Sequence, residues 1–103
     1  MSERTANRVA AFRRQKLRVL EMIKYYRNNH PTIYVSFEKS CHYDWAIDEA
    51  YNTVMRSTDA PMEVLDCLLS KYDGWAHTNT RSSWIFSVAA SAIEDLIDHI
   101  LTG

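Results

Sequence analysis

Glycine and proline are scarce in this chain, with only two of each among 103 residues. An all-β sandwich or barrel of this length needs many tight turns, which depend on these residues. A hydrophobic fraction of 47% is enough to build a core, and the length suits one domain. We therefore predict an all-α fold in which residues 1–103 form a single helical domain.

Apolar side chains recur at the period of an α-helix in four segments of the chain. The first, over residues 5–28, ends before Pro31 and buries a stripe that faces away from Arg14, Arg18 and Tyr25. The next two are predicted over residues 43–56 and 60–72. The last begins between residues 78 and 83 and continues to about residue 101. The fold class that follows is a compact, four-helix, bundle-like domain.

Local signals set the expected ends of these helices. Ser40 is a candidate N-cap for the second helix, and Asp59, followed by Pro61, for the third. Gly74 is expected to end the third helix, because glycine adopts the left-handed terminal conformation with the least strain. Residues 32–37 alternate apolar and polar side chains. They are predicted as an extended connector, with an edge strand or a strand paired across a dimer as alternatives.

The last helix has apolar residues over more than about half of its circumference, which is wider than a helix at the surface needs. It is therefore predicted to be the central helix, wrapped by the other three. The same width leaves a homodimer open, in which a second copy covers part of the apolar arc.

Charge is segregated along the chain, although the net charge is only −1. Residues 1–30 contain eight basic and two acidic residues, whereas residues 31–103 contain four basic and eleven acidic ones. We expect the basic charges mainly to pair with the acidic remainder, within the chain or between subunits. The first helix offers candidate partner-binding residues, which are Arg13, Arg14, Arg18 and Tyr25. Acidic candidates on the second and last helices are Asp48, Glu49, Glu94, Asp95 and Asp98.

Tryptophan is enriched where proteins bind one another, because its ring buries a large rigid area. The helical period turns Trp45 away from the apolar stripe of its helix, so it is a further candidate for partner binding. Trp75 and Trp84 lie near predicted helix ends, where we expect them to cap the core.

The residues that usually carry catalysis or metal binding show no recognisable pattern. The four histidines and two cysteines follow neither C-x-x-C nor H-E-x-x-H spacing, and two glycines cannot form a phosphate-binding loop. The neighbouring carboxylates at 48–49 and 94–95 are expected on solvated helix faces, not as an acid and base pair. We therefore expect a protein that is not an enzyme, with no catalytic residues, metal, cofactor or small-molecule substrate.

Nothing in the chain indicates secretion or a membrane partner. Its first residues are charged, and no run of about 18 apolar residues occurs. Cys41 and Cys67 lack the spacing of a disulfide framework. We expect them to be free, packed thiols in a cytoplasmic protein.

The sequence SSWIFSVAASAIEDLIDHI, residues 82–100, resembles short uncharacterised helical proteins of mobile elements and phages of Gram-positive bacteria. This resemblance covers the last third of the chain and implies an accessory protein of a mobile element. We interpret the chain as a non-catalytic, protein-binding regulatory module. Its specific form would be an inhibitor whose acidic surface occupies the phosphate groove of a host nucleic-acid-targeting defence enzyme. The alternative is DNA or RNA binding through the first helix, although its cations are spread around the helix.

Overall fold

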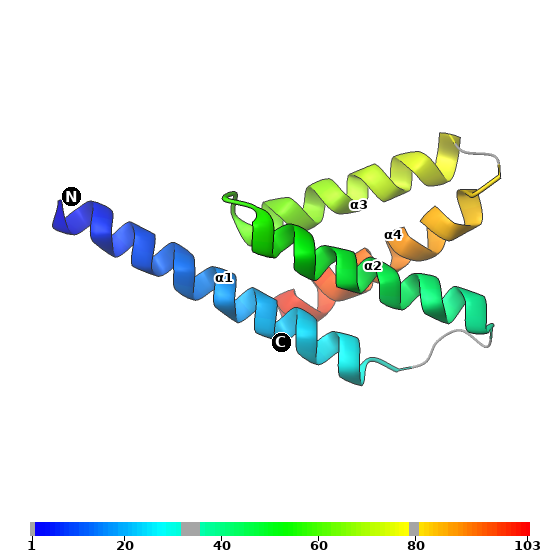
Figure 1. The fold of residues 1–103 in the computed structure, drawn as a ribbon, viewed down its shortest axis with the longest axis horizontal. Helices are drawn as coiled ribbons and strands as arrows, with labels where there is room; N and C mark the ends of the chain where they lie inside the picture. Colours follow the sequence, from blue (N-terminus) through cyan, green and yellow to red (C-terminus); the bar gives the residue numbers. More distant parts are fainter. Residues whose placement is uncertain (1, 32–35, 79–80) are drawn as a thin grey trace.

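The computed structural model describes residues 2–31, 36–78 and 81–103, which form four α-helices (Figure 1). The helices in chain order are α1 (Glu3–Asn29), α2 (Phe37–Arg56), α3 (Pro61–Thr78) and α4 (Ser83–Thr102). These described residues contain no β-strand. The predicted all-α, four-helix, bundle-like fold is confirmed. No helix in the described part of the chain is long and apolar enough to cross a bilayer.

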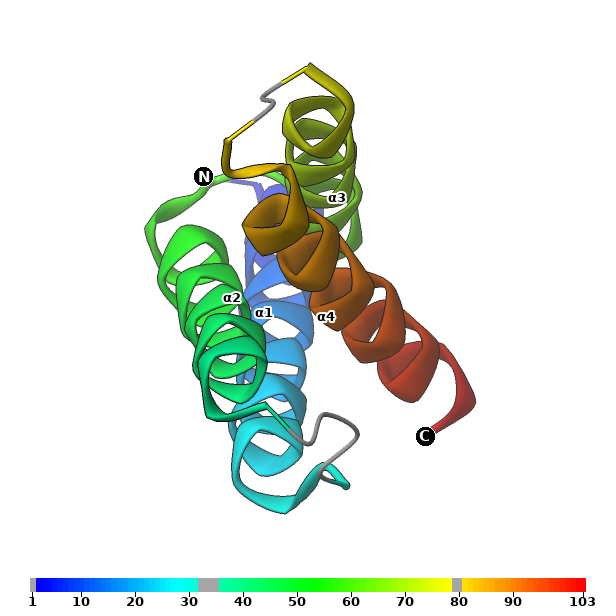
Figure 2. The ribbon, with the colours of Figure 1, turned by 90° about the vertical axis from the view of Figure 1, so that its right-hand side faces the viewer.

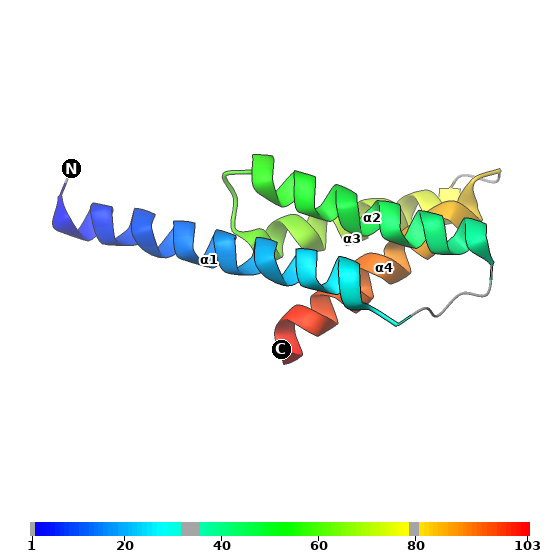
Figure 3. The same ribbon diagram turned by 60° about the horizontal axis from the view of Figure 1, so that its bottom comes forward.

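The helices are arranged as two neighbouring pairs, with α1 beside α2 and α3 beside α4 (Figure 2). The α3–α4 and α2–α4 pairs have the most extensive packing. Every helix contacts the other three, but α4 takes part in both of the most extensive packings, so the core is built around α4. The last turn of α4 runs out alongside the middle of α1 (Figure 3).

The core contains apolar side chains from every helix, at the spacing that the sequence indicates. Ile23 of α1, Ile47 of α2, Leu65 of α3 and Leu96 of α4 are all 0% exposed. The apolar spacing of the second helix also predicts that Met55 faces inward, and this is wrong, because Met55 is 48% exposed near the end of α2.

Helix α2 begins at Phe37, well before the predicted residue 43. Its N-cap is Ser36 instead of Ser40, because the Ser36 side chain accepts a hydrogen bond from the Lys39 backbone N–H at 3.4 Å. The Ser40 N–H is already used inside the helix, where it donates to the Ser36 carbonyl at 3.0 Å. Phe37 therefore belongs to a helix and not to the extended connector. The predicted connector residues 32–35 lie outside the described residues.

Helix α3 begins at Pro61 and runs through Gly74 to Thr78, so the prediction that Gly74 ends it is wrong. Glycine inside a helix costs only about 1 kcal/mol relative to alanine. The next residue, Trp75, packs edge-on against Phe86 of α4 with ring centroids 4.9 Å apart, which favours continuing the helix. At the start of α3, the Ala60 carbonyl accepts the first helical bond, from Val64 at 3.1 Å. The N-cap position thus falls one residue after the predicted Asp59.

The first half of α1 projects beyond the other helices (Figures 1 and 3). Lys16 marks the point of departure, since its Nζ donates to the carbonyl oxygen of Ser57 in the α2–α3 loop at 2.9 Å. We term residues 3–15 the α1 extension and residues 16–103 the body. All residues of the α1 extension are described and none is buried, although Val9 and Phe12, which continue the apolar stripe, are partly covered.

Candidate partner-binding surfaces

Aromatic rings from three helices meet around Tyr72, which is 3% exposed. Its ring centroid lies 5.8 Å from Trp45 of α2, 6.1 Å from Trp75 of α3 and 6.2 Å from Phe86 of α4. The rings of α2 and α4 contact Tyr72 of α3, and Trp75 lies one helical turn after Tyr72 on the same side of α3. We term these four rings, together with Glu49 and Lys71, the aromatic face.

The aromatic face combines partly exposed rings with two opposite charges. Trp45 is 42% exposed and Trp75 is 40% exposed. The Lys71 Nζ lies 4.7 Å from the centroid of the Trp75 ring, in a cation–π contact. Burial, together with the negative charge on Glu49, raises the pKa of Tyr72 to about 12, so this ring stays neutral at physiological pH. The predicted outward position of Trp45 is confirmed.

Trp75 and Trp84, which we expected to cap the core, do so only in part. Trp75 packs on Tyr72 and Phe86 but keeps much of its ring in solvent. Trp84 is 39% exposed and contacts the ring of His42 edge-on, with centroids 5.1 Å apart. Among the described residues, Trp84 makes no ring contact with the four rings of the aromatic face.

The basic candidates on α1 have no ion-pair partner in the described part of the chain. Arg13, Arg14 and Arg18 are all exposed, and none of the ion pairs between described residues includes them, so the expected pairing with the acidic remainder does not involve them there. Arg27 does pair in this way, because its Nε lies 3.0 Å from Asp48 Oδ1. Tyr25 is 61% exposed, and its ring stacks on His99 of α4 at a centroid distance of 6.2 Å.

The acidic candidates fall into three different settings. Asp48 is held by Arg27, and Glu49 is half-buried beside Tyr72. Glu94 and Asp98 are exposed on α4, as predicted. Asp95 was expected on the solvated strip, which is wrong, because its Oδ2 accepts a hydrogen bond from the buried Tyr43 hydroxyl at 2.8 Å. The sequence-predicted acidic residues are therefore not equally available to a partner.

Asp95 belongs to a polar cluster between α1, α2 and α4 that the sequence did not reveal. The Tyr43 hydroxyl donates to Asp95, so the Tyr26 hydroxyl, 2.6 Å away, donates to the Tyr43 oxygen. Burial and these hydrogen bonds raise the pKa of Tyr43 above its usual range. Nearby, His30 Nε2 lies 2.7 Å from Asp44 Oδ1. This cluster joins the three helices and is a structural feature of the core.

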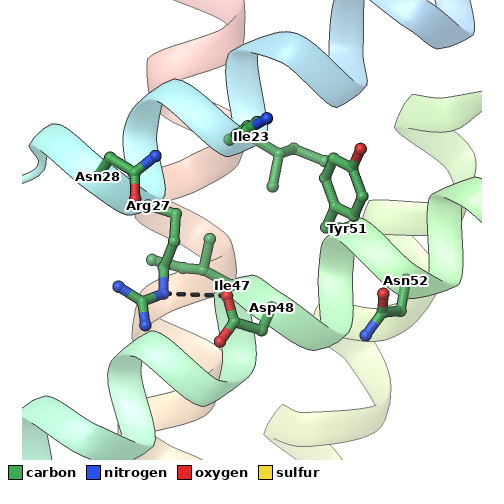
Figure 4. Close-up of a pocket in the computed structure, with 8 residues that line it drawn as sticks. Ile23, Arg27, Asn28, Ile47, Asp48, Tyr51 and Asn52 are labelled. Atoms are coloured by element: carbon green, nitrogen blue, oxygen red, sulfur yellow. Dashed lines mark hydrogen bonds and ion pairs between the residues drawn. The ribbon is translucent and has the colours of Figure 1, made fainter.

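A pocket of about 610 Å³ lies between α1 and α2 (Figure 4). Its floor is apolar, with Ile23 and Ile47, and its polar lining includes Asn28 and Asn52. The Arg27–Asp48 ion pair bridges the two helices within it (Figure 4). These two charges satisfy each other, which leaves Lys24 as the lining charge without an ion pair to a described residue. The lining contains no Ser, Cys or His side chain that could act as a nucleophile.

The described residues contain no group of three or more His, Cys, Asp or Glu side chains that could hold a metal ion. Cys41 and Cys67 are free but exposed, so the prediction that their side chains are packed is wrong. Both sit on helix positions that turn away from the core, which spacing alone could have indicated.

Comparison of the chain with protein-family models, with curated proteins and with solved structures finds no match. The resemblance of residues 82–100 to proteins of mobile elements and phages stays a prediction.

Proposed function

We propose that the chain is a non-catalytic protein-binding module, of the accessory or regulatory kind, that holds its partner on the aromatic face. One observation carries the proposal. Trp45 and Trp75, at 42% and 40% exposure, stand on different helices and flank the same buried Tyr72.

The aromatic face has the properties of a binding hot spot. Apolar area left in water costs about 25 cal/mol per Å², so covering two indole rings would supply a large part of a binding free energy. Packing on Tyr72 limits the freedom of both indoles before a partner arrives, which reduces the entropy lost on binding. Lys71 and Glu49 add charged groups at its rim.

The partner we favour is a protein with an apolar patch bordered by charges of both signs. In the specific form suggested by the charge pattern, it is a host nucleic-acid-targeting defence enzyme that the chain inhibits. Glu94 and Asp98 are the exposed acidic candidates that could enter a groove meant for phosphates. Asp48 and Asp95 already have partners within the chain, which leaves fewer acidic side chains for such a groove. The inhibitor role therefore has weaker support than protein binding by the aromatic face.

A cytoplasmic location is part of the proposal. Cys41 and Cys67 are free and exposed, a state that persists where thiols are kept reduced. No catalytic step is proposed.

The proposal is tested by affinity capture from a host lysate with the wild-type chain, Trp45→Ala, Trp75→Ala and the double variant. We expect proteins captured by the wild type to be bound at least about tenfold more weakly by the double variant. Trp84→Ala is the matched control, because Trp84 is 39% exposed and its ring contacts that of His42, which is not part of the aromatic face. Circular dichroism checks that each variant is folded. Unchanged capture by the folded double variant would disprove the proposal.

Nucleic-acid binding through α1 is a second candidate, favoured by the exposure of Arg14 and Arg18 without ion pairs to described residues. A gel-shift titration across salt concentrations tests it, since phosphate contacts weaken steeply as salt rises. We expect Arg14→Glu with Arg18→Glu to abolish any shift. Absence of a shift at low ionic strength with the wild type would exclude this function.

A further inference from the structure

The apolar stripe of α1 continues past the end of the body. In the body, Val19 and Ile23 of this stripe are buried against other helices. In the α1 extension, which projects beyond the other helices (Figure 1), Val9 and Phe12 occupy the same stripe and are only partly covered. A helix of about 13 residues is only marginally stable in water by itself, so covering this stripe would stabilise the α1 extension.

Charged side chains flank the stripe in the α1 extension. At about 100° per residue, Arg8 and Arg13 lie on opposite sides of the Val9–Phe12 stripe, each roughly 70° from its centre. Arg14 points away from the stripe. The α1 extension carries four arginines and one glutamate, a net charge of +3, whereas residues 16–103 carry −4. A surface that covers the stripe should therefore be apolar in its centre and acidic at its edge.

The body contains such a surface at the end of the bundle from which the α1 extension departs. A pocket of about 310 Å³ lies between the C-terminal end of α2 and the first turns of α3. We term it the loop-end pocket. Val64 and Leu68 provide its apolar lining, and Asp59 and Glu63 provide its acidic groups. Its single lysine, Lys71, contacts Trp75, so the acidic charge lies nearer the loop.

We propose that two copies of the chain form a dimer in which the α1 extension of each copy docks in the loop-end pocket of the other. Val9 and Phe12 contact the Val64–Leu68 lining, and Arg8 and Arg13 pair with the acidic groups. The loop-end pocket shares Lys71 with the aromatic face, but the proposed dimer contacts use none of the four rings of that face.

The positions of the two surfaces permit a reciprocal exchange. Lys16 Nζ, at the base of the α1 extension, donates to the carbonyl of Ser57, and Ser57 lines the loop-end pocket. Both surfaces thus lie at one end of the molecule, so a two-fold axis placed there brings each α1 extension to the partner's pocket. The α1 extension is about 20 Å long at 1.5 Å per residue, which is enough to follow the first three turns of α3.

Cys67 lines the loop-end pocket and provides a direct test. One copy carries Val9→Cys, Cys41→Ser and Cys67→Ser, and a differently tagged copy carries Cys41→Ser and keeps Cys67. After mixing and mild oxidation, we expect a mixed disulfide product with twice the 12.0 kDa mass of one chain. The control replaces Val9→Cys with Ala10→Cys, on the outer side of the α1 extension, and should give several-fold less mixed product. Equal cross-linking by the two variants would overturn the proposal.

Charge reversal provides a second test that needs no cross-link. Arg8→Glu with Arg13→Glu should convert the dimer to a monomer in analytical ultracentrifugation, and so should Asp59→Arg with Glu63→Arg. In a mixed dimer of the two double variants both exchanged contacts are again complementary, one with the native charges and one with the charges reversed, so mixing should recover dimers. Arg14→Glu, which reverses a charge away from the stripe, should leave the dimer intact.

Circular dichroism confirms that these surface variants remain folded. A wild-type chain that stays monomeric throughout a wide dilution series overturns the proposal, and so does a dimer that survives both charge reversals. A monomer whose α1 extension binds DNA or RNA would assign this surface to nucleic acid instead. We expect a folded Trp45→Ala, Trp75→Ala variant to dimerise as the wild type does, even where it no longer captures a protein partner. This result would separate the test of the dimer from the test of the proposed function.

Discussion

The two halves of α1 have the same helical pattern but are held by different forces. In the half that lies against the body, Val19, Leu20 and Ile23 are buried, and Tyr26 is hydrogen-bonded to Tyr43. In the α1 extension, all of which is described, no residue is buried. Beyond its backbone hydrogen bonds, this half of the helix is stabilised by the Ser2 N-cap, whose side chain accepts a hydrogen bond from the Thr5 N–H. Apolar periodicity therefore predicts where a helix forms, but not whether its own chain covers it.

Truncating one apolar side chain in each half should give the largest contrast. Ile23→Ala removes a side chain that is 0% exposed and should lower the free energy of unfolding by about 2–5 kcal/mol. Val9→Ala should lower it by less than about 1 kcal/mol in dilute protein, because Val9 is partly in solvent. Urea unfolding followed by tryptophan fluorescence measures both values. Equal losses would mean that the α1 extension is packed as firmly as the rest of α1.

Removing the Tyr43 hydroxyl tests the polar cluster that joins α2 and α4 to the half of α1 that lies against the body. Tyr43→Phe leaves Asp95 without its donor and the Tyr26 hydroxyl without its acceptor, so we expect a loss of about 1–3 kcal/mol. Tyr25→Phe is the control, since Tyr25 is exposed and its ring can still stack on His99. Chemical denaturation of both variants gives the comparison, and a Tyr43→Phe loss no larger than that of Tyr25→Phe would contradict it.

Alkaline pH should weaken the body through its buried tyrosines. Tyr72 has a pKa of about 12 in the folded chain against 10.0 when unperturbed, because burial and Glu49 disfavour its charged form. A raised pKa means that the stability contribution is complete below pH 10 and is lost as pH rises toward 12. Thermal unfolding across this window should show a falling midpoint. Tyr72→Phe should show a shallower fall, and an identical slope would refute the assignment.

Gly74→Ala should stabilise the body modestly. Gly74 lies inside α3, and no other group lies within 4 Å of an added Cβ. Alanine is favoured over glycine in a helix interior by about 1 kcal/mol. We expect the free energy of unfolding to rise by about that amount in urea. A decrease would show that the position needs a backbone that only glycine provides.

Ala10→Gly should have the smallest effect on the body and a visible effect on the α1 extension. Glycine lowers local helix stability by about 1 kcal/mol, and this segment has few other contacts to compensate. Amide hydrogen exchange should therefore become faster over residues 3–15. The unfolding free energy of the body should change by less than about 0.5 kcal/mol, and a larger drop would mean that the two regions unfold together.

The helices could be predicted because their apolar residues keep one period over several turns. Their ends could not, because each end is decided by a few competing contacts. At Ser36 a side-chain cap prevails over the alternating pattern of TIYVSF, so Phe37 becomes helical. Gly74 has a low helix propensity, but the packing of Trp75 on Phe86 favours continuing α3 beyond it.

The candidate surfaces could be predicted only in part. The outward positions of Trp45, Arg14 and Arg18 follow from helical periodicity alone. The meeting of Trp45 with Trp75 across Tyr72 depends on how α2 and α3 pack, which no local pattern specifies. For the same reason, the sequence placed Asp95 in solvent, although a tyrosine from α2 binds it.

The projecting α1 extension gives the molecule a permanent electric dipole. A net charge of +3 lies at one end and −4 in the remainder, along a particle whose longest dimension is 52 Å. In dilute salt, the field of an approaching molecule would turn this particle before the two surfaces touch. This orientation before contact should raise the rate of association. The effect should weaken as salt is added, because the screening length falls to about 10 Å at 0.1 M salt.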